Sequence, residues 1–230
     1  MSEPQHTAHY DPLVHVAPPD RTDAEAEVRA RLGRAIRDVG HAVVGRHASV
    51  DDLQSTAATI ELLAAQLDRG ALRNRYEDEP RAGVWASPPV DGEIMASHDE
   101  RPISGRSSPW GLDFEVHREG DEVVAVVTMR AAHEGAPGRS HGGLVAALFD
   151  DVLGFVLNIL SVPAFTGELT VRYEAGTPVG VPLECRCRLA GQEGRKLFMT
   201  GELADAGRVI ARTTATFITI DPERFLAGTA

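Results

Sequence analysis

Hydrophobic residues follow three different spacings along the chain, and each spacing predicts a different kind of element. Between residues 21 and 70 they recur every three or four positions, which predicts amphipathic helices. Residues 144–160 are apolar on almost every side, which predicts a helix buried within a core. On both sides of that run apolar and polar residues alternate, as they do in strands with one buried face. The pattern therefore predicts an α+β protein.

The first 70 residues predict a tail followed by a helical hairpin at 21–70. Residues 1–20 are polar and contain proline, as is typical of a disordered tail. Thr22 and Glu25 have capping-box spacing before one helix, and Ser49 with Asp52 starts a second. The short connection favours antiparallel helices, and the main domain or a partner chain must cover their apolar stripes. The stripes consist of Val28, Leu32, Ile36, Val39 and Val43 in the first helix, and of Leu53, Ala57, Ile60, Ala64 and Leu67 in the second.

Residues 71–109 are rich in proline, glycine, serine and charge, and they predict a linker with a short extended piece at 92–96. Because the segment is long for a structureless loop, part of it is a candidate to lie across a substrate groove. From residue 110 to 225 we expect two strands, the central helix and four more strands, which favours an antiparallel sheet wrapped around that helix. The strands are predicted at 112–117, 123–129, 168–173, 182–189, 197–203 and 209–220.

The central helix begins with two adjacent glycines and carries two carboxylates in its middle. Gly142 and Gly143 follow His141, and glycine lets a ligand approach the helix-start amides, which have no intrahelical partner. Such amides can stabilise negative charge that develops on a carbonyl oxygen. Asp150 and Asp151 interrupt the apolar run, so a membrane span is not expected, and a buried carboxylate must be paired or used.

One helix cannot bring its own first amides and its own Asp150 to the same carbonyl group. Asp150 follows His141 by nine residues, which is about 13.5 Å along the helix axis and roughly on the opposite side. If both groups serve one reaction, they must come from two copies of the helix. The spacing therefore predicts a homodimer or a dimer of dimers with the site at an interface.

These motifs resemble those of hotdog-fold acyl-CoA thioesterases of the PaaI type, most of all the branch that includes the carboxyl-terminal modulator protein. The resemblance rests on His-Gly-Gly with an aspartate nine residues after the histidine, and it covers about residues 110–225. Further similar segments are Glu134–Gly135, Pro137–Gly138, Glu193–Phe198 and Ala215–Ile218. The resemblance implies a hotdog fold and the hydrolysis of acyl-CoA to a free acid and CoA, without a metal or a cofactor.

The resemblance also implies roles for five residues. The Gly142 amide, with Gly143 nearby, would polarise the thioester carbonyl, and His141 would shape the helix start or hydrogen-bond near the thioester. Asp150 of the partner subunit would act as a general base on water or attack directly as a nucleophile. Thr166 would position the water or the carboxylate.

Alternative interpretations stay open for each of these groups. Asp150 can be a structural carboxylate paired with an arginine, and only the resemblance selects it over Asp151, which lies 100° further round the helix. His141 can be a plain helix cap. Position 135, where some relatives carry asparagine, is glycine here. For the whole protein, the non-enzyme alternative is an acyl-CoA-binding hotdog protein without activity. A hotdog dehydratase or hydratase would need a different histidine and acid pattern.

The net charge of −11 argues against nucleic acid and anionic membranes as general partners, so an anionic substrate needs a local basic patch. Arg195 and Lys196 are the candidates to bind the phosphates of CoA, with Arg186 and Arg188 as further members of that patch. The alternative for all of them is a solvated strand edge.

Cys185 and Cys187 lie two residues apart in one predicted strand, so both should face the same side, which does not favour a disulfide between them. We expect a buried, reduced pair. A Cys-X-Cys pair alone is too little for a metal site. The first 20 residues contain no apolar segment typical of a secretory signal, so the expected location is cytoplasmic.

Overall fold

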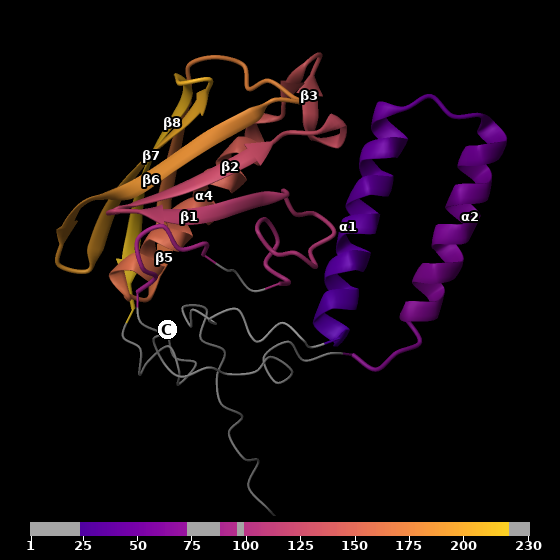
Figure 1. Ribbon diagram of the computed structural model, residues 1–230, viewed down its shortest axis with the longest axis horizontal. Helices are drawn as coiled ribbons and strands as arrows, with labels where there is room; N and C mark the ends of the chain where they lie inside the picture. Colours follow the sequence, from indigo (N-terminus) through magenta and orange to yellow (C-terminus); the bar gives the residue numbers. More distant parts are fainter. Residues whose placement is uncertain (1–23, 73–87, 96–98, 221–230) are drawn as a thin grey trace, which may run out of the picture.

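A long helix, α4 (Gly142–Leu160), lies against one face of a six-stranded antiparallel sheet (Figure 1). The computed structural model describes residues 24–72, 88–95 and 99–220. This is the hotdog arrangement that the sequence predicts, with two helices preceding it. The predicted tail at 1–20, and the parts of the linker at 73–87 and 96–98, lie outside the described residues, as do Thr22 and residues 221–225.

All six predicted strands are present, in the order β1-β2-β6-β7-β8-β5 across the sheet. They are β1 (Phe114–Glu119), β2 (Glu122–Thr128), β5 (Ala164–Tyr173), β6 (Pro182–Glu193), β7 (Lys196–Asp205) and β8 (Arg208–Thr219). β5 begins four residues before the predicted start, because its pairing with β8 continues through a bulge at Gly167. The extended piece predicted at 92–96 is confirmed at Ile94, which forms a bridge with His117 on the outer side of β1.

Three short elements between β2 and α4 have no clear periodicity in the sequence. They are a 3₁₀ turn, η1 (Ala131–His133), and the two-stranded ribbon of β3 (Glu134–Ala136) and β4 (Arg139–Ser140). Two or three residues are too few to show a repeating pattern. These elements lead directly into His141, so they fix where α4 begins.

The core lies between α4 and the inner face of the sheet. Nine residues of α4 are buried, including Leu148 and Phe149. By length and composition α4 would suit a membrane span, but here the sheet covers it as a core helix. The prediction that α4 is buried on every side is wrong for one strip, where Gly143 and Asp150 are exposed. The strip is open because the sheet covers only one side of the helix.

The two cysteines form part of this core and are both free. Cys185 and Cys187 are buried on the inner face of β6, with their sulfur atoms 3.9 Å apart. This confirms the predicted reduced pair. Burial raises the pKa of the Cys187 thiol, which keeps it protonated and unreactive.

The first helix, α1 (Ala24–Gly45), docks on the sheet domain through polar groups. The buried guanidinium of Arg37 donates to the carboxylate of Asp113 at 2.7 Å and to the carbonyls of Arg106 and Ser108. A Cβ at Gly33 would overlap the backbone of Ser107, so only glycine allows this approach. The apolar stripe of α1 borders this polar docking face and stays largely exposed.

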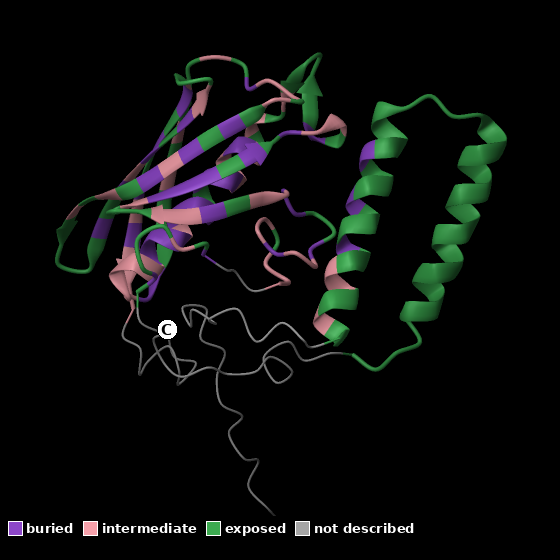
Figure 2. Cartoon of the chain, viewed as in Figure 1, coloured by how far each residue is buried: buried purple, intermediate pink, exposed green. Residues whose placement is uncertain are grey.

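The second helix, α2 (Val50–Leu67), runs antiparallel to α1, and no residue in it is buried (Figure 2). Ser49 caps it as predicted, with its side chain accepting a hydrogen bond from the Asp52 amide at 3.1 Å. Within the described chain, the main domain covers the apolar stripe of neither helix. The prediction that this domain covers the stripes is therefore ruled out for the described residues.

Two histidines connect α1 to the start of α4. The His41 and His133 rings meet edge to face at 4.6 Å, and the His41 Nδ1 accepts a hydrogen bond from the Ala132 amide. The backbone of His133 in turn accepts from the His141 amide at 2.8 Å. Burial lowers the pKa of His133 to about 4 and also lowers the pKa of His41. Both rings are therefore neutral near pH 7.

Acidification should weaken the fold through His133. The unfolded chain binds a proton at this residue below about pH 6.5, whereas the folded chain does so only near a pKa of about 4. The free energy of unfolding should therefore fall as pH falls between these values. Urea unfolding from about pH 7.5 to about pH 4.5 should show a shallower fall for His133→Asn, which keeps an acceptor near the Nδ1 position. His47→Asn, at an exposed histidine, is the control, and equal slopes for wild type and His133→Asn would refute the assignment.

Candidate active site

The start of α4 offers one free amide. His141 is the N-cap, and its Nδ1 accepts a hydrogen bond from the Gly143 amide at 3.0 Å. An accepting Nδ1 carries no proton, so the proton of the neutral ring lies on Nε2. Gly142 is the first residue of the helix, where an amide has no intrahelical acceptor. The Gly142 amide is therefore the donor that can face a ligand, while the Gly143 amide is already engaged.

Two neighbours hold this helix start in place. The hydroxyl of Tyr173, from the far end of β5, donates to the Gly142 carbonyl at 2.7 Å. A Cβ at position 135 would lie 2.8 Å from the Cβ of His141. The asparagine that some relatives carry there would therefore have no room beside His141. Tyr173 was not among the predicted site residues, because an aromatic residue at a strand end is common.

The structure brings Asp150 and Thr166 together. Asp150 lies on the exposed strip of α4, and its Oδ1 accepts a hydrogen bond from the Thr166 hydroxyl at 2.8 Å. Thr166 precedes the bulge at Gly167, where the β5 register shifts relative to β8. A bulge redirects the neighbouring side chains, which explains how a strand residue reaches the helix.

Asp151 has a different environment from Asp150. It is buried, and the Arg101 Nε lies 2.6 Å from its carboxylate. The guanidinium also lies 5.2 Å from the centre of the Phe155 ring, beside Gly154, where a Cβ would overlap it. Burial raises the pKa of Asp151, and the charge of Arg101 opposes this shift. The arginine pairing considered for Asp150 thus occurs at Asp151, through an arginine that the sequence analysis had placed in the linker.

The predicted basic patch divides into two parts. Arg195 and Lys196 are exposed in the turn between β6 and β7. Ile218 pairs with Lys196 on one side and with Phe165 on the other, so this turn lies at the Thr166 end of the sheet.

Arg186 and Arg188 belong to a different surface. Arg186 pairs with Glu119, Glu122 and Glu184, and Arg188 pairs with Glu122. They face residues of β2 in the sheet register and do not extend the patch at the turn. Among the described residues, no cluster of three or more His, Cys, Asp or Glu side chains is arranged to hold a metal ion.

A single chain therefore holds these two groups as separate halves of the candidate site. The Gly142 amide and the Asp150 carboxylate belong to one helix and are eight residues apart, or about 12 Å along its axis. Each half has its own support from β5, Tyr173 at one end and Thr166 at the other.

Residues 138–211, which include both halves, match the family model of the Thioesterase superfamily. This part of the chain is therefore similar to a thioesterase superfamily domain. It is similar to the acyl-coenzyme A thioesterase THEM4 of Bos taurus, with 24% identity over 156 residues, 66% of this chain and 65% of the relative. It is also similar to THEM4 of Mus musculus, with 33% identity over 125 residues, 52% of this chain and 54% of the relative. The chain thus spans between about half and two thirds of these relatives.

The fold is also similar to the crystal structure of a thioesterase superfamily protein, with 25% identity and a TM-score of 0.69. That similarity covers 83% of this chain and 94% of the other. Coverage of this extent must include part of the N-terminal helices, because the residues after Leu72 make up a smaller share of the chain. The sheet domain and at least part of the helices before it therefore occur together in another protein.

Removing the cation of Arg101 should destabilise the fold. Arg101→Met leaves the buried Asp151 carboxylate without its counter-charge, or forces it to take up a proton, at a cost of about 3 kcal/mol. Urea unfolding measures this loss. The double variant Arg101→Met with Asp151→Asn removes the unpaired charge and should recover most of the loss. A double variant no more stable than Arg101→Met would contradict the ion-pair explanation.

Proposed function

We propose that this protein hydrolyses acyl-CoA thioesters to a free acid and CoA. The observation that carries the proposal is Asp150, a carboxylate on the exposed strip of the core helix, which Thr166 holds at 2.8 Å. The same helix starts with an amide that is free to bind a carbonyl oxygen. The thioesterase superfamily domain and the acyl-CoA thioesterase relatives support this choice of reaction.

The open edge of the sheet supports a site made by two subunits. Within the described chain no strand pairs with the outer side of β5, which is ten residues long. The opposite edge is partly closed, because the Met95 amide donates to the Val116 carbonyl on β1 at 2.8 Å. A long open edge is a template for pairing with another chain. We therefore assign β5 as the edge that pairs with a second copy.

Antiparallel pairing of two β5 strands joins the two halves. A two-fold axis between Leu169 and Thr170 places Thr166 of one subunit opposite Tyr173 of the partner subunit. Thr166 holds Asp150, and Tyr173 holds Gly142. This register therefore brings the carboxylate of one subunit toward the helix-start amide of the other.

The exposed strip of α4 agrees with this axis. Ala146 is midway between Gly142 and Asp150 in the sequence. When two antiparallel α4 helices cross at Ala146, Gly142 of each helix lies toward Asp150 of the other. The strip contains the small residues Gly143 and Ala146, which allow two helices to approach closely. The helix and the edge strand thus favour the same dimer.

In the proposed reaction, the Gly142 amide donates to the thioester oxygen and stabilises its negative charge. Asp150 of the partner subunit takes a proton from water as the water oxygen bonds to the carbonyl carbon. The intermediate then collapses, the C–S bond breaks, and the departing CoA sulfur takes the proton that Asp150 accepted, which restores the carboxylate. In the covalent alternative, the Asp150 carboxylate bonds to the carbonyl carbon, the C–S bond breaks and the CoA thiolate leaves; water then hydrolyses the anhydride, which releases the free acid and restores the carboxylate. The Thr166 hydrogen bond holds one carboxylate oxygen and leaves the other for either step.

The substrate phosphates would bind at the turn between β6 and β7. Arg195 and Lys196 are exposed there, at the end of the sheet that carries Thr166. The glutamates around Arg186 and Arg188 already neutralise those side chains. The turn is therefore the cationic surface that suits CoA.

Asp150→Asn should lower kcat by at least about 100-fold while the urea midpoint stays the same, because it removes the acceptor for the water proton. A thiol-release assay over aliphatic and aromatic acyl-CoA esters measures this effect. Asp121→Asn makes the same chemical change at an exposed turn distant in sequence, and it should leave kcat unchanged. Full activity of Asp150→Asn would contradict the assignment. A wild-type protein that binds acyl-CoA but releases no thiol from any ester would identify the non-catalytic binder instead.

A further inference from the structure

The N-terminal hairpin presents an apolar surface that nothing in the described chain covers. The five residues of the α1 stripe are between 37% and 54% exposed, and Leu53 and Ile60 of α2 are 43% and 44% exposed. Helices of this length are marginally stable in water unless an apolar face is packed against something. Exposed apolar surfaces of this extent are typical of interfaces.

Docking on the sheet domain leaves the stripe of α1 free. At 100° per residue, Leu32 and Ile36 lie about 100° or more round the helix from Arg37 and His41, which make polar docking contacts; Gly33, which meets the Ser107 backbone, lies about 60° from Ile36, so the stripe borders the docking face. α2 lies on the far side of α1 from the sheet (Figure 1). The hairpin thus stands beside the domain with its apolar faces accessible.

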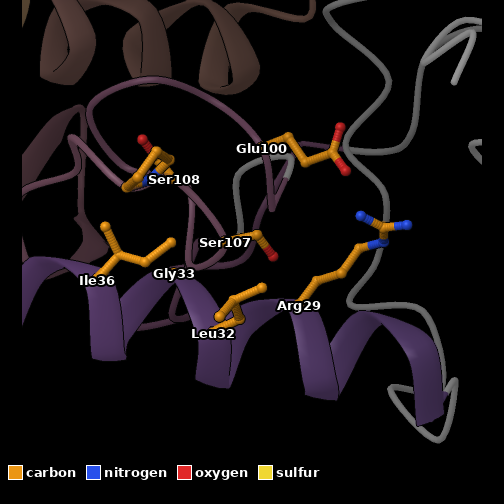
Figure 3. A pocket seen from close by; sticks show the side chains of 8 residues that line it. Arg29, Leu32, Gly33, Ile36, Glu100, Ser107 and Ser108 are labelled. Atoms are coloured by element: carbon orange, nitrogen blue, oxygen red, sulfur yellow. The ribbon is translucent and has the colours of Figure 1, made fainter. Parts of the chain in front are cut away.

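A groove on α1 adjoins this apolar surface. It has a volume of about 260 Å³ and lies between α1 and the loop that carries Ser107, Ser108 and Pro109. Figure 3 shows Leu32 and Ile36 facing this loop, with Arg29 and Glu100 toward one end. The groove is concave and partly apolar, so it suits the insertion of apolar side chains from another helix.

The charges of the two helices complement each other. α2 contains three acidic residues, Asp51, Asp52 and Glu61, and no basic residue. On α1, Arg31 flanks one side of the apolar stripe; Arg29 flanks the other side and is paired with Glu25 at 2.6 Å. One hairpin therefore carries both signs of charge next to apolar faces, as a self-complementary interface between identical subunits requires.

We propose that the hairpin packs against the hairpin of a second copy of this chain, with α2 of one copy lying along α1 and its groove in the other. The helices have 22 and 18 residues, so they are about 33 Å and 27 Å long. With a width of about 10 Å each, they present a face of about 600 Å². This is close to the roughly 800 Å² that each partner contributes to a stable interface. The product is a four-helix bundle.

This interface is separate from the open edge at β5. α1 contacts η1 and, through Asp113, the start of β1, which forms the opposite edge of the sheet. Each chain therefore carries two self-complementary surfaces, and together they give a dimer of dimers. The hairpin interface does not depend on the thioesterase function, because none of its residues belongs to the candidate active site.

A charge placed in the stripe should split the assembly. In sedimentation velocity, the full-length Ile60→Glu variant should have about half the mass of wild type. Ala58→Glu adds the same charge on the opposite side of α2, about 200° round the helix, and should keep the wild-type mass. Thiol release should be the same in all three proteins. Equal masses for wild type and Ile60→Glu would overturn the proposal.

Cross-linking between copies gives a second, direct readout. Because Cys185 and Cys187 are buried, a short thiol cross-linker reacts with introduced cysteines only. A mixture of Ile36→Cys and a size-tagged Ile60→Cys carries one new thiol per chain, so every product joins two copies. We expect more of the mixed product than for Ile36→Cys with Ala58→Cys. Equal yields would overturn the assignment of α2 to α1 of another copy.

Discussion

The distance along one helix is the constraint on which the rest of the structure depends. The free amide at the start of α4 and the exposed carboxylate of Asp150 are about 12 Å apart on a rigid element, so they cannot act on one carbonyl group from the same chain. The helix is rigid because the sheet buries most of it. In the proposed reaction each chain therefore supplies two half-sites, and the open edge strand β5 is the surface proposed to join them.

Several contacts fix α4 so that both half-sites keep their positions. Tyr173 and Thr166 hold the two halves from the ends of the same strand, β5. Arg101 ties the middle of the helix to the preceding loop through Asp151. The His133 carbonyl accepts a hydrogen bond from the His141 amide, and the His133 ring packs against His41 of α1. α1 therefore contacts the residues that lead into α4, although none of its residues belongs to the candidate active site.

Much of the fold and the main half-site residues could be predicted because they are encoded locally. Alternation predicted the six strands, Ser49 predicted the start of α2, and the apolar run that follows the glycine pair predicted the core helix. The contacts that the sequence did not predict join distant residues. Tyr173 with Gly142 and Arg101 with Asp151 depend on how strands and loops pack, which no periodicity records.

The errors have the same origin. The helix appeared apolar on all sides, yet the sheet covers only one side of it and leaves Asp150 exposed. Arg186 and Arg188 are neutralised by glutamates from neighbouring strands, which depends on a register that the sequence does not state.

Subunit complementation tests the central claim most directly. Asp150→Asn removes the carboxylate, and Gly142→Pro removes the amide at the helix position where proline is best tolerated, after an extended residue. Each variant alone should be inactive. If the two are refolded together in equal amounts, half of the dimers are mixed, and each mixed dimer has one intact site. We predict recovery of about a quarter of the wild-type thiol-release activity. A mixture as inactive as its components, with mixed dimers present, would contradict a site shared between subunits.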